Sequence, residues 1–216
     1  PSGRKKVPDI RESELAIVGL PVYAGRLPNL LLNYLTTWQS NGAWAVPVVV
    51  YGNRSYGNAL VELYDILRYR GFHPIAAAAF VGQHSFTTRL ATGRPDREDL
   101  EKAEQFSAEI VRRILQPGEF TGIKIPGQGA PDYGGYYKPK GRDEEVVNFL
   151  KAKPVTTDAC IDCRRCAKVC PMGAIRLDHP SEVSGICIKC NACVKQCPVH
   201  AKQLTDEAYL SHVGFL

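Results

Sequence analysis

Two stretches of the sequence decide the fold of the C-terminal quarter: CIDCRRCAKVCP at residues 160–171 and CIKCNACVKQCP at residues 187–198. Both follow the pattern C-x2-C-x2-C-x3-C-P, and a shift of 27 residues carries the first onto the second. The same shift aligns several residues that are not cysteines: Ile161 with Ile188, Ala167 with Val194, Lys168 with Lys195 and Ala174 with Ala201. The repeat therefore predicts a duplicated unit with a pseudo-twofold axis.

The spacing of the cysteines predicts iron–sulfur chemistry. This run is the ligand pattern of bacterial ferredoxins with two [4Fe-4S] clusters, in which the fourth cysteine of each run ligates the other cluster. We expect one cluster on Cys160, Cys163, Cys166 and Cys197, and the other on Cys187, Cys190, Cys193 and Cys170. The predicted C-terminal domain is a small α+β dicluster ferredoxin, and its predicted role is one-electron transfer.

Two other uses of cysteine fit the sequence less well. Structural zinc sites take four ligands in two pairs, whereas these runs are triplets followed by a Cys-Pro. A disulfide framework would require an oxidising compartment. All eight cysteines fall between Cys160 and Cys197 of a longer chain that shows no secretory segment.

The composition is that of an ordinary globular protein, with 44% hydrophobic and 23% charged residues. Its 216 residues fit one medium domain and one small domain. The longest apolar runs, residues 43–51 and 75–81, are too short to span a bilayer. No targeting segment is visible, so we expect a cytoplasmic protein. Because the chain opens at Pro1 rather than Met, the sequence leaves open what precedes it.

The formal net charge of +5 does not indicate a nucleic-acid partner. Each [4Fe-4S] cluster with its four thiolates carries about −2 when oxidised, so two clusters would bring the charge to about +1. The basic residues are also spread along the sequence rather than gathered into one stripe. We expect the partner to be a redox protein or another low-potential electron donor, and the oligomeric state stays open.

The first 124 residues alternate short apolar runs with amphipathic segments, the pattern of a parallel α/β sheet. We expect strands at residues 15–21, 46–51 and 75–81. Helices are expected after Pro28, over residues 58–70, and after Asp96, which is a favourable N-cap residue.

Two loops that contain glycine and tyrosine follow the first two predicted strands: PVYAGRLP at residues 21–28 and GNRSYGN at residues 52–58. In open α/β sheets, ligands bind beyond the carboxyl ends of the strands. Glycine lets the backbone approach a planar ligand, and tyrosine can stack on one. The loops therefore predict a ligand site, with His84 after the third strand as a candidate for its rim. The alternative is that the tyrosines only cap the edge of the sheet.

These two phrases and the cysteine runs together resemble the flavodoxin–ferredoxin fusion family, in which a flavodoxin-like domain precedes a two-cluster ferredoxin. The resemblance covers nearly the whole chain and implies FMN as a cofactor. It implies that Tyr56 stacks on the flavin ring, that Gly52 and Asn53 contact its pyrimidine edge or N5, and that residues 23–25 line the opposite side. The implied flavin site comprises Pro21, Val22, Tyr23, Ala24, Gly25, Gly52, Asn53, Arg54, Tyr56 and Asn58.

One feature of flavodoxins is missing from the sequence. They begin with a strand and a Ser/Thr/Gly-rich loop that binds the FMN phosphate at a helix N-terminus, whereas residues 1–13 are charged and irregular. The missing strand would be central in the usual strand order, so we expect an apolar edge of the sheet to be unpaired. The domain is therefore expected to be N-terminally incomplete, which weakens the expectation of FMN.

We expect four segments along the chain. They are the incomplete flavodoxin-like domain (1–124), a linker with a short helix (125–153), the ferredoxin domain (154–204) and a tail (205–216). The linker is rich in glycine and proline, and DEEVVNFL at residues 143–150 is expected to form its helix. Tyr133, Tyr136 and Tyr137 would pack the linker onto a domain, and the apolar tail is expected to dock on a neighbouring surface or a partner.

The sequence supports three functions. The first is an electron carrier that passes electrons between the two clusters, FMN and a redox partner, with FMN linking one-electron to two-electron chemistry. The second is a flavin-dependent reductase of a small substrate, although no paired carboxylates, Cys–His dyad or GxGxxG motif indicates one. The third is a ferredoxin module with a flavin-free docking domain.

Overall fold

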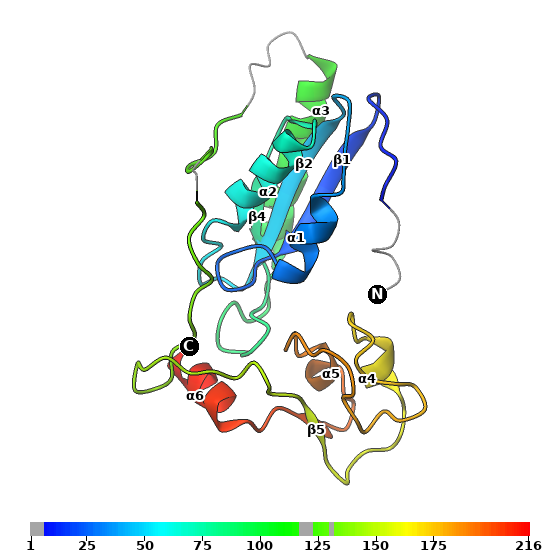
Figure 1. Ribbon diagram of the computed structural model, residues 1–216, viewed down its shortest axis with the longest axis vertical. Helices are drawn as coiled ribbons and strands as arrows, with labels where there is room; N and C mark the ends of the chain where they lie inside the picture. Colours follow the sequence, from blue (N-terminus) through cyan, green and yellow to red (C-terminus); the bar gives the residue numbers. More distant parts are fainter. Residues whose placement is uncertain (1–6, 117–122, 130–131) are drawn as a thin grey trace. The chain divides into compact units, whose positions relative to one another are not determined.

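The computed structural model describes residues 7–116, 123–129 and 132–216. They divide into two compact units (Figure 1): the N-terminal unit contains residues 7–84 and 89–137, and the C-terminal unit contains Ser85–Thr88 and Lys138–Leu216. The first is a parallel α/β sheet and the second a small α+β unit rich in cysteine, as the sequence predicted.

The N-terminal unit is built on a parallel sheet with β2 (Trp44–Tyr51) at its centre. β1 (Leu15–Pro21) pairs with β2 along its whole length. β3 (His73–Pro74) and β4 (Ala78–Val81) both pair with β2 as well. The third predicted strand thus begins earlier than expected, at His73, and is interrupted between Pro74 and Ala78.

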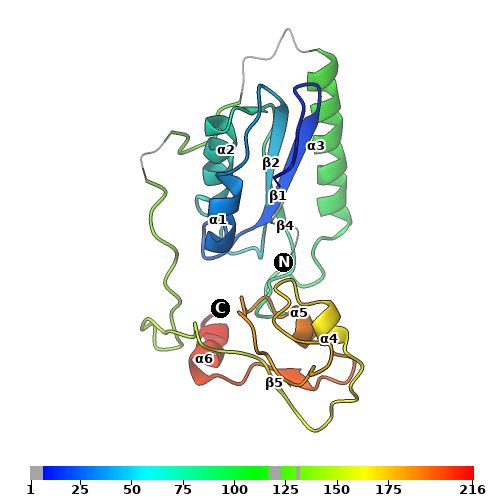
Figure 2. The same ribbon diagram turned by 45° about the vertical axis from the view of Figure 1, so that its right-hand side comes forward.

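Helices cover both faces of this sheet (Figure 2). α1 (Asn29–Leu35) and α2 (Ala59–Tyr69) lie on one face, and α3 (Arg97–Leu115) lies on the other. α3 begins at the predicted cap, because the Asp96 side chain accepts the Asp99 N–H while the Asp99 side chain accepts the Asp96 N–H. Among the described residues, no helix combines the length and the apolarity needed to cross a membrane.

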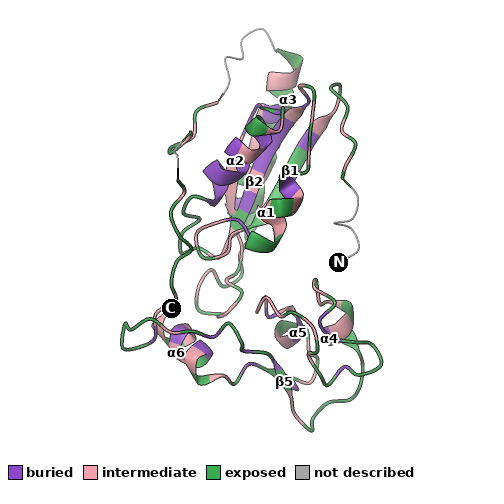
Figure 3. Cartoon of the chain, viewed as in Figure 1, coloured by how far each residue is buried: buried purple, intermediate pink, exposed green. Residues whose placement is uncertain are grey.

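The core lies on both faces of β2, where alternate side chains point in opposite directions. Ala45 and Val49 pack toward α2 with Leu63, whereas Val46 packs with Ile110 of α3. Figure 3 shows the buried residues of α2 and β2 together at the centre of the unit. The burial on both faces explains why β2 is a nearly continuous apolar run.

The edge strand β1 is less covered than β2. Its Ile17 is 65% exposed, although its register partner Val46 is fully buried. Among the described residues β1 pairs only with β2, in line with the predicted apolar edge. Residues 7–13 form no helix or strand, and the rest of the segment expected to be irregular, residues 1–6, lies outside the described residues.

The C-terminal unit contains a two-stranded sheet and three helices. β5 (Val155–Thr156) pairs antiparallel with β6 (Lys202–Gln203). α4 (Arg165–Lys168) and α5 (Ala192–Lys195) each lie within one cysteine run. α6 (Glu207–Phe215) forms the tail and is capped by the Asp206 side chain.

The predicted linker helix at residues 143–150 is wrong, because this segment contains only turns and irregular backbone. Glu144 has a left-handed φ of 64°. The side chains of Asp143 and Asn148 each accept a hydrogen bond from the backbone N–H two residues further on. Such local bonds compete with those of a helix.

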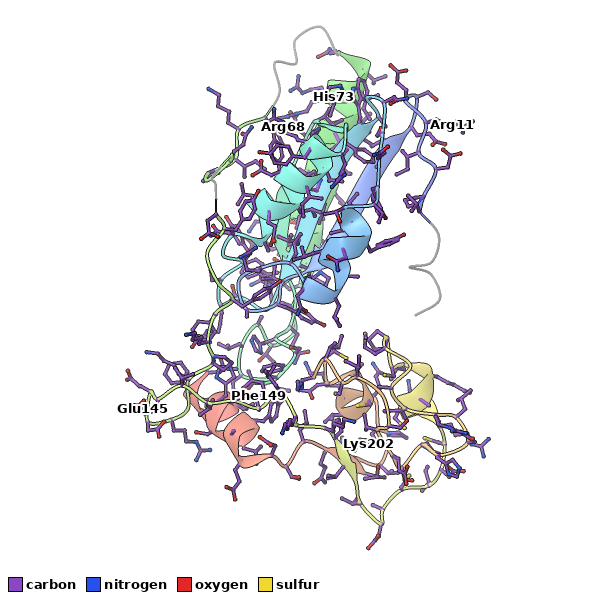
Figure 4. All side chains as sticks on the ribbon, in the orientation of Figure 1. Arg11, Arg68, His73, Glu145, Phe149 and Lys202 are labelled. Atoms are coloured by element: carbon purple, nitrogen blue, oxygen red, sulfur yellow. The ribbon has the colours of Figure 1, made fainter. Side chains whose placement is uncertain are left out.

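An aromatic core forms instead around Phe149, which is 9% exposed and is labelled in Figure 4. Its ring lies 5.6 Å from that of Tyr209 and 5.4 Å from that of His212, both on α6. Phe86 packs in the same group, which explains why Ser85–Thr88 belong to this unit. The tail therefore docks on the C-terminal unit of its own chain.

Candidate functional site

The two cysteine runs adopt the same local backbone. The helices α4 and α5 begin 27 residues apart, as the sequence repeat requires. Left-handed residues recur with the same shift, all with φ between 52° and 60°: Asp162 and Lys189, Arg164 and Asn191, and Gly173 and His200. Since non-glycine residues rarely adopt this conformation, its recurrence indicates one loop geometry built twice.

Backbone N–H groups contact the cysteine sulfurs in matched positions. Ala174 N–H donates to Cys170 Sγ at 3.3 Å, and its repeat equivalent Ala201 N–H donates to Cys197 Sγ at 3.2 Å. Hydrogen bonds of this kind stabilise thiolates and tune the potential of a bound cluster. The loops therefore suit anionic sulfur.

The thiols differ in how readily they lose a proton. Burial raises the pKa of Cys193 to about 11, and the neighbouring Cys190 and Cys187 add to the effect. Burial also acts to raise the pKa of Cys197, but the backbone N–H groups of residues 199–202 outweigh it and lower that pKa overall. Because cluster ligands must be deprotonated, cluster binding has to overcome the raised pKa of Cys193, whereas the backbone N–H groups near Cys197 favour its thiolate.

One pocket of the C-terminal unit is lined by cysteines from both runs. Cys170 lines it together with Cys187, Cys190 and Cys193, and Ile175 and Val183 give it apolar cover. The first run therefore supplies its fourth cysteine, and none of its first three, to the pocket of the second run. An apolar shell limits access of water to a cluster and so influences its potential.

The eight cysteines are all free thiols, so no disulfide competes for them. Within residues 7–116, 123–129 and 132–216, no three His, Cys, Asp or Glu side chains converge closely enough to hold a single metal ion. The donor set nevertheless fits two cysteine-ligated clusters, because it consists of eight thiols in two matched loops with N–H groups at the sulfurs.

Comparison with known protein families agrees with this chemistry. Residues 159–201 match the family model of the 4Fe-4S dicluster domain. This dicluster domain contains all eight cysteines and implies electron transfer through two [4Fe-4S] clusters. No curated protein and no solved structure matches the chain.

The two loops predicted as a ligand site lie in contact at the carboxyl ends of β1 and β2. Asn58 N–H donates to the Gly25 carbonyl at 2.9 Å. The loop after β4 approaches the same edge, since a Cβ added to Gly52 would lie 2.6 Å from the His84 ring. The structure thus brings together the loop residues that the sequence singled out.

Within the first loop, Pro21 ends β1. Val22 extends the pairing with β2 by donating its N–H to the Val50 carbonyl oxygen at 3.0 Å. Tyr23 and Arg26 close a tight turn by exchanging two backbone hydrogen bonds. Ala24 in this turn has a left-handed φ of 50°.

In the second loop, Asn53 has a left-handed φ of 59°. The Tyr56 ring meets that of Tyr51 edge-on at 5.4 Å, and Tyr56 is 40% exposed. The Arg54 guanidinium lies 5.1 Å from the ring of Tyr137.

Sequence reasoning missed that residues 133–137, the tyrosine segment, contact both loops. Tyr137 N–H donates to the Ala24 carbonyl at 2.9 Å, and Asn58 Nδ2 donates to the Tyr133 carbonyl at 2.8 Å. The three tyrosines of the segment were the available signal, but a linear pattern does not reveal where a linker packs.

Two buried carboxylates on α2 anchor these contacts. Glu62, 3% exposed, accepts two hydrogen bonds from the Arg26 guanidinium at 2.9 and 2.7 Å and one from Leu27 N–H at 3.0 Å. The hydrogen bond to Glu62 raises the pKa of Arg26. Asp65, 2% exposed, accepts the Tyr133 hydroxyl at 2.8 Å. One helix therefore holds both the first loop and the tyrosine segment.

The contact between the loops gives a stability prediction. Gly57→Ala should lower the free energy of unfolding, because Gly57 has a φ of +51° and an added Cβ would lie 2.4 Å from the Gly25 carbonyl oxygen. The backbone strain alone costs about 1 kcal/mol. Gly93→Ala is the matched control, since Gly93 also has a positive φ but open space at the Cβ position. Urea denaturation should show the larger loss for Gly57→Ala, and equal losses would contradict the close approach.

Proposed function

We propose that the chain is an electron carrier whose dicluster domain exchanges single electrons with a redox partner and with FMN held by the loops at the carboxyl ends of β1 and β2. The observation that carries the electron-transfer part is the duplicated four-cysteine loop with matched N–H contacts to sulfur. When bound, each cluster takes up or releases one electron.

For the cysteines we propose crossed ligation. Cys160, Cys163, Cys166 and Cys197 would hold the first cluster, and Cys187, Cys190, Cys193 and Cys170 the second. The shared pocket of Cys170 with the second run supports this assignment. The backbone N–H groups at Cys170 and Cys197 would then stabilise charge on the one ligand that each run gives to the other cluster.

For the flavin we propose the loop site, with Tyr56 as the stacking residue. Three observations support it: the two loops meet, the Tyr56 ring is partly exposed, and the tyrosine segment adds aromatic surface next to them. The left-handed residues Ala24 and Asn53 turn the backbone sharply at this edge of the sheet, where ligands of open α/β sheets bind.

The flavin part is tested by Tyr56→Ala. We expect the affinity for FMN to fall about tenfold, since an aromatic contact contributes about 0.5–1.5 kcal/mol beyond its buried area. Anaerobic titration of FMN, followed by the quenching of its fluorescence, measures this. Tyr69→Ala is the matched control, because Tyr69 is 79% exposed on α2 and its loss should not change the affinity. Equal affinities for the Tyr56→Ala and unmodified proteins would remove Tyr56 from the site.

The complete proposal is tested by electron transfer within the chain. The cluster-loaded protein is reduced anaerobically, freed of excess reductant and mixed with FMN in a stopped-flow spectrometer. We expect the bleached cluster absorbance to return as one electron per cluster reduces the flavin, at a rate that becomes independent of FMN concentration once the site is filled. Clusters that bind while FMN shows no saturable binding would favour the ferredoxin with a docking domain.

A further inference from the structure

A lysine is buried inside the C-terminal unit. Lys202 on β6 is 2% exposed and is labelled in Figure 4. Its Nζ donates to Thr156 Oγ1 at 2.6 Å and to the Ser181 carbonyl at 3.0 Å. Lysine is almost never fully buried unless it is paired with an opposite charge. Its burial therefore predicts a negative charge near Lys202.

The two groups that Lys202 contacts are both uncharged. Within the described part of the chain, no carboxylate lies within 4.0 Å of its Nζ. Burying an ammonium without an opposite charge costs several kcal/mol, and neutral hydrogen bonds compensate only part of that. A negative charge close to Lys202 would compensate the remaining cost of burying the ammonium. A [4Fe-4S] cluster with four thiolates carries about −2 when oxidised.

The contacts of Lys202 place it beside Cys166 and Cys197, two of the four cysteines proposed for the first cluster. Ser181 follows Pro180, whose carbonyl contacts Cys166 Sγ at 3.6 Å. Ala201, next to Lys202 in sequence, donates its N–H to Cys197 Sγ. Burial raises the pKa of the Cys166 thiol, and the charge of Lys202 is the largest effect acting against it.

The repeat shows that this charge is present in only one half of the unit. The shift of 27 residues that superposes the cysteine runs places Ile175 opposite Lys202. Both side chains are buried, with exposures of 4% and 2%. Two loops of the same geometry therefore differ by one buried positive charge. This charge is the largest effect that opposes burial at Cys166, whereas at Cys193 of the second run it is a smaller effect than those of two neighbouring cysteines.

We propose that the buried Lys202 ammonium stabilises the reduced state of the cluster held by Cys160, Cys163 and Cys166, and thereby gives that cluster a higher reduction potential than the second. Reduction adds one negative charge to a cluster, so a nearby positive charge favours it. The two reduction potentials are then unequal, and a single electron that enters the unit preferentially reduces the first cluster. This inference depends on the proposed cluster assignment.

The test is a potential-controlled EPR titration of the cluster-loaded protein and of Lys202→Met. At a fixed potential, we expect the oxidised-to-reduced ratio of the first cluster to rise about tenfold in the variant. This corresponds to a negative shift of its reduction potential by about 59 mV for a one-electron couple. The other cluster should shift less. Lys153→Met is the matched control, because Lys153 belongs to the same unit but is exposed, and water screens its charge. We expect no shift for it.

A second variant separates the charge from packing. In Ile175→Lys/Lys202→Ile the charge moves to the equivalent position of the other repeat, and the second cluster should become the one with the higher potential. Unchanged potentials in Lys202→Met with both clusters present would overturn the inference. If Lys202→Met loses its clusters, Lys202→Arg should keep both clusters and the difference between their reduction potentials. Loss of clusters in both variants would assign Lys202 a structural role and also overturn it. An unmodified protein without two clusters would instead refute the proposed function.

Discussion

The Cys170→Ala variant should lose about half of its iron, from about eight to about four atoms per chain, and the cluster that it loses should be the one on the second run. The reason is the pocket that Cys170 shares with Cys187, Cys190 and Cys193. Iron and sulfide analysis after anaerobic reconstitution measures the loss.

Double variants show which cluster has gone. In Cys170→Ala/Cys190→Ala both substitutions affect the same predicted cluster, so the iron content should stay at about four atoms per chain. In Cys170→Ala/Cys160→Ala each substitution affects a different cluster, and nearly all iron should be lost. The reverse pattern would show that each run holds its own cluster and would refute crossed ligation.

Glu62→Gln should lower the free energy of unfolding of the N-terminal unit by about 3 kcal/mol. Glutamine keeps the shape of the side chain but leaves the Arg26 guanidinium, only 14% exposed, without its negative partner. Breaking a buried ion pair by removing one partner typically costs about 3–5 kcal/mol. The two tryptophans, Trp38 and Trp44, lie in this unit, so their fluorescence reports its urea denaturation separately from the C-terminal unit.

The matched control for this variant is Glu104→Gln, which removes the same charge from an exposed position on α3. It should change the free energy of unfolding by less than about 0.5 kcal/mol. If the two variants were equally stable, Glu62 would not hold the first loop and the tyrosine segment. The account of how α2 supports the candidate flavin site would then be wrong.

The elements that local sequence determines were predicted well. β1 has the predicted bounds because the apolar run from Leu15 to Pro21 is clearly delimited. The α3 N-terminus is also as predicted, because the side chains of Asp96 and Asp99 accept backbone N–H groups at the start of the helix. Both residues lie within four positions of each other, so this cap can be seen in the local sequence. The dicluster fold follows from the cysteine spacing, since each ligand has to reach a cluster from its own position in the loop.

The features that were missed depend on contacts between distant parts of the chain. The helix expected at 143–150 has suitable residues, yet Phe149 is held by α6 about sixty residues later. Tyr133 packs on Asp65 of α2, which no local pattern indicates. Lys202 stands in a polar stretch that resembles surface sequence, and only its equivalence to Ile175 in the repeat could have indicated burial.

The most direct test of the central claim is the stoichiometry of the anaerobically reconstituted chain, combined with EPR of its reduced state. We predict about eight iron atoms and eight sulfides per chain, with two reducible [4Fe-4S] clusters that interact magnetically. Tightly bound zinc without sulfide, or iron that gives no reducible cluster signal, would contradict electron transfer as the function of the cysteine-rich unit.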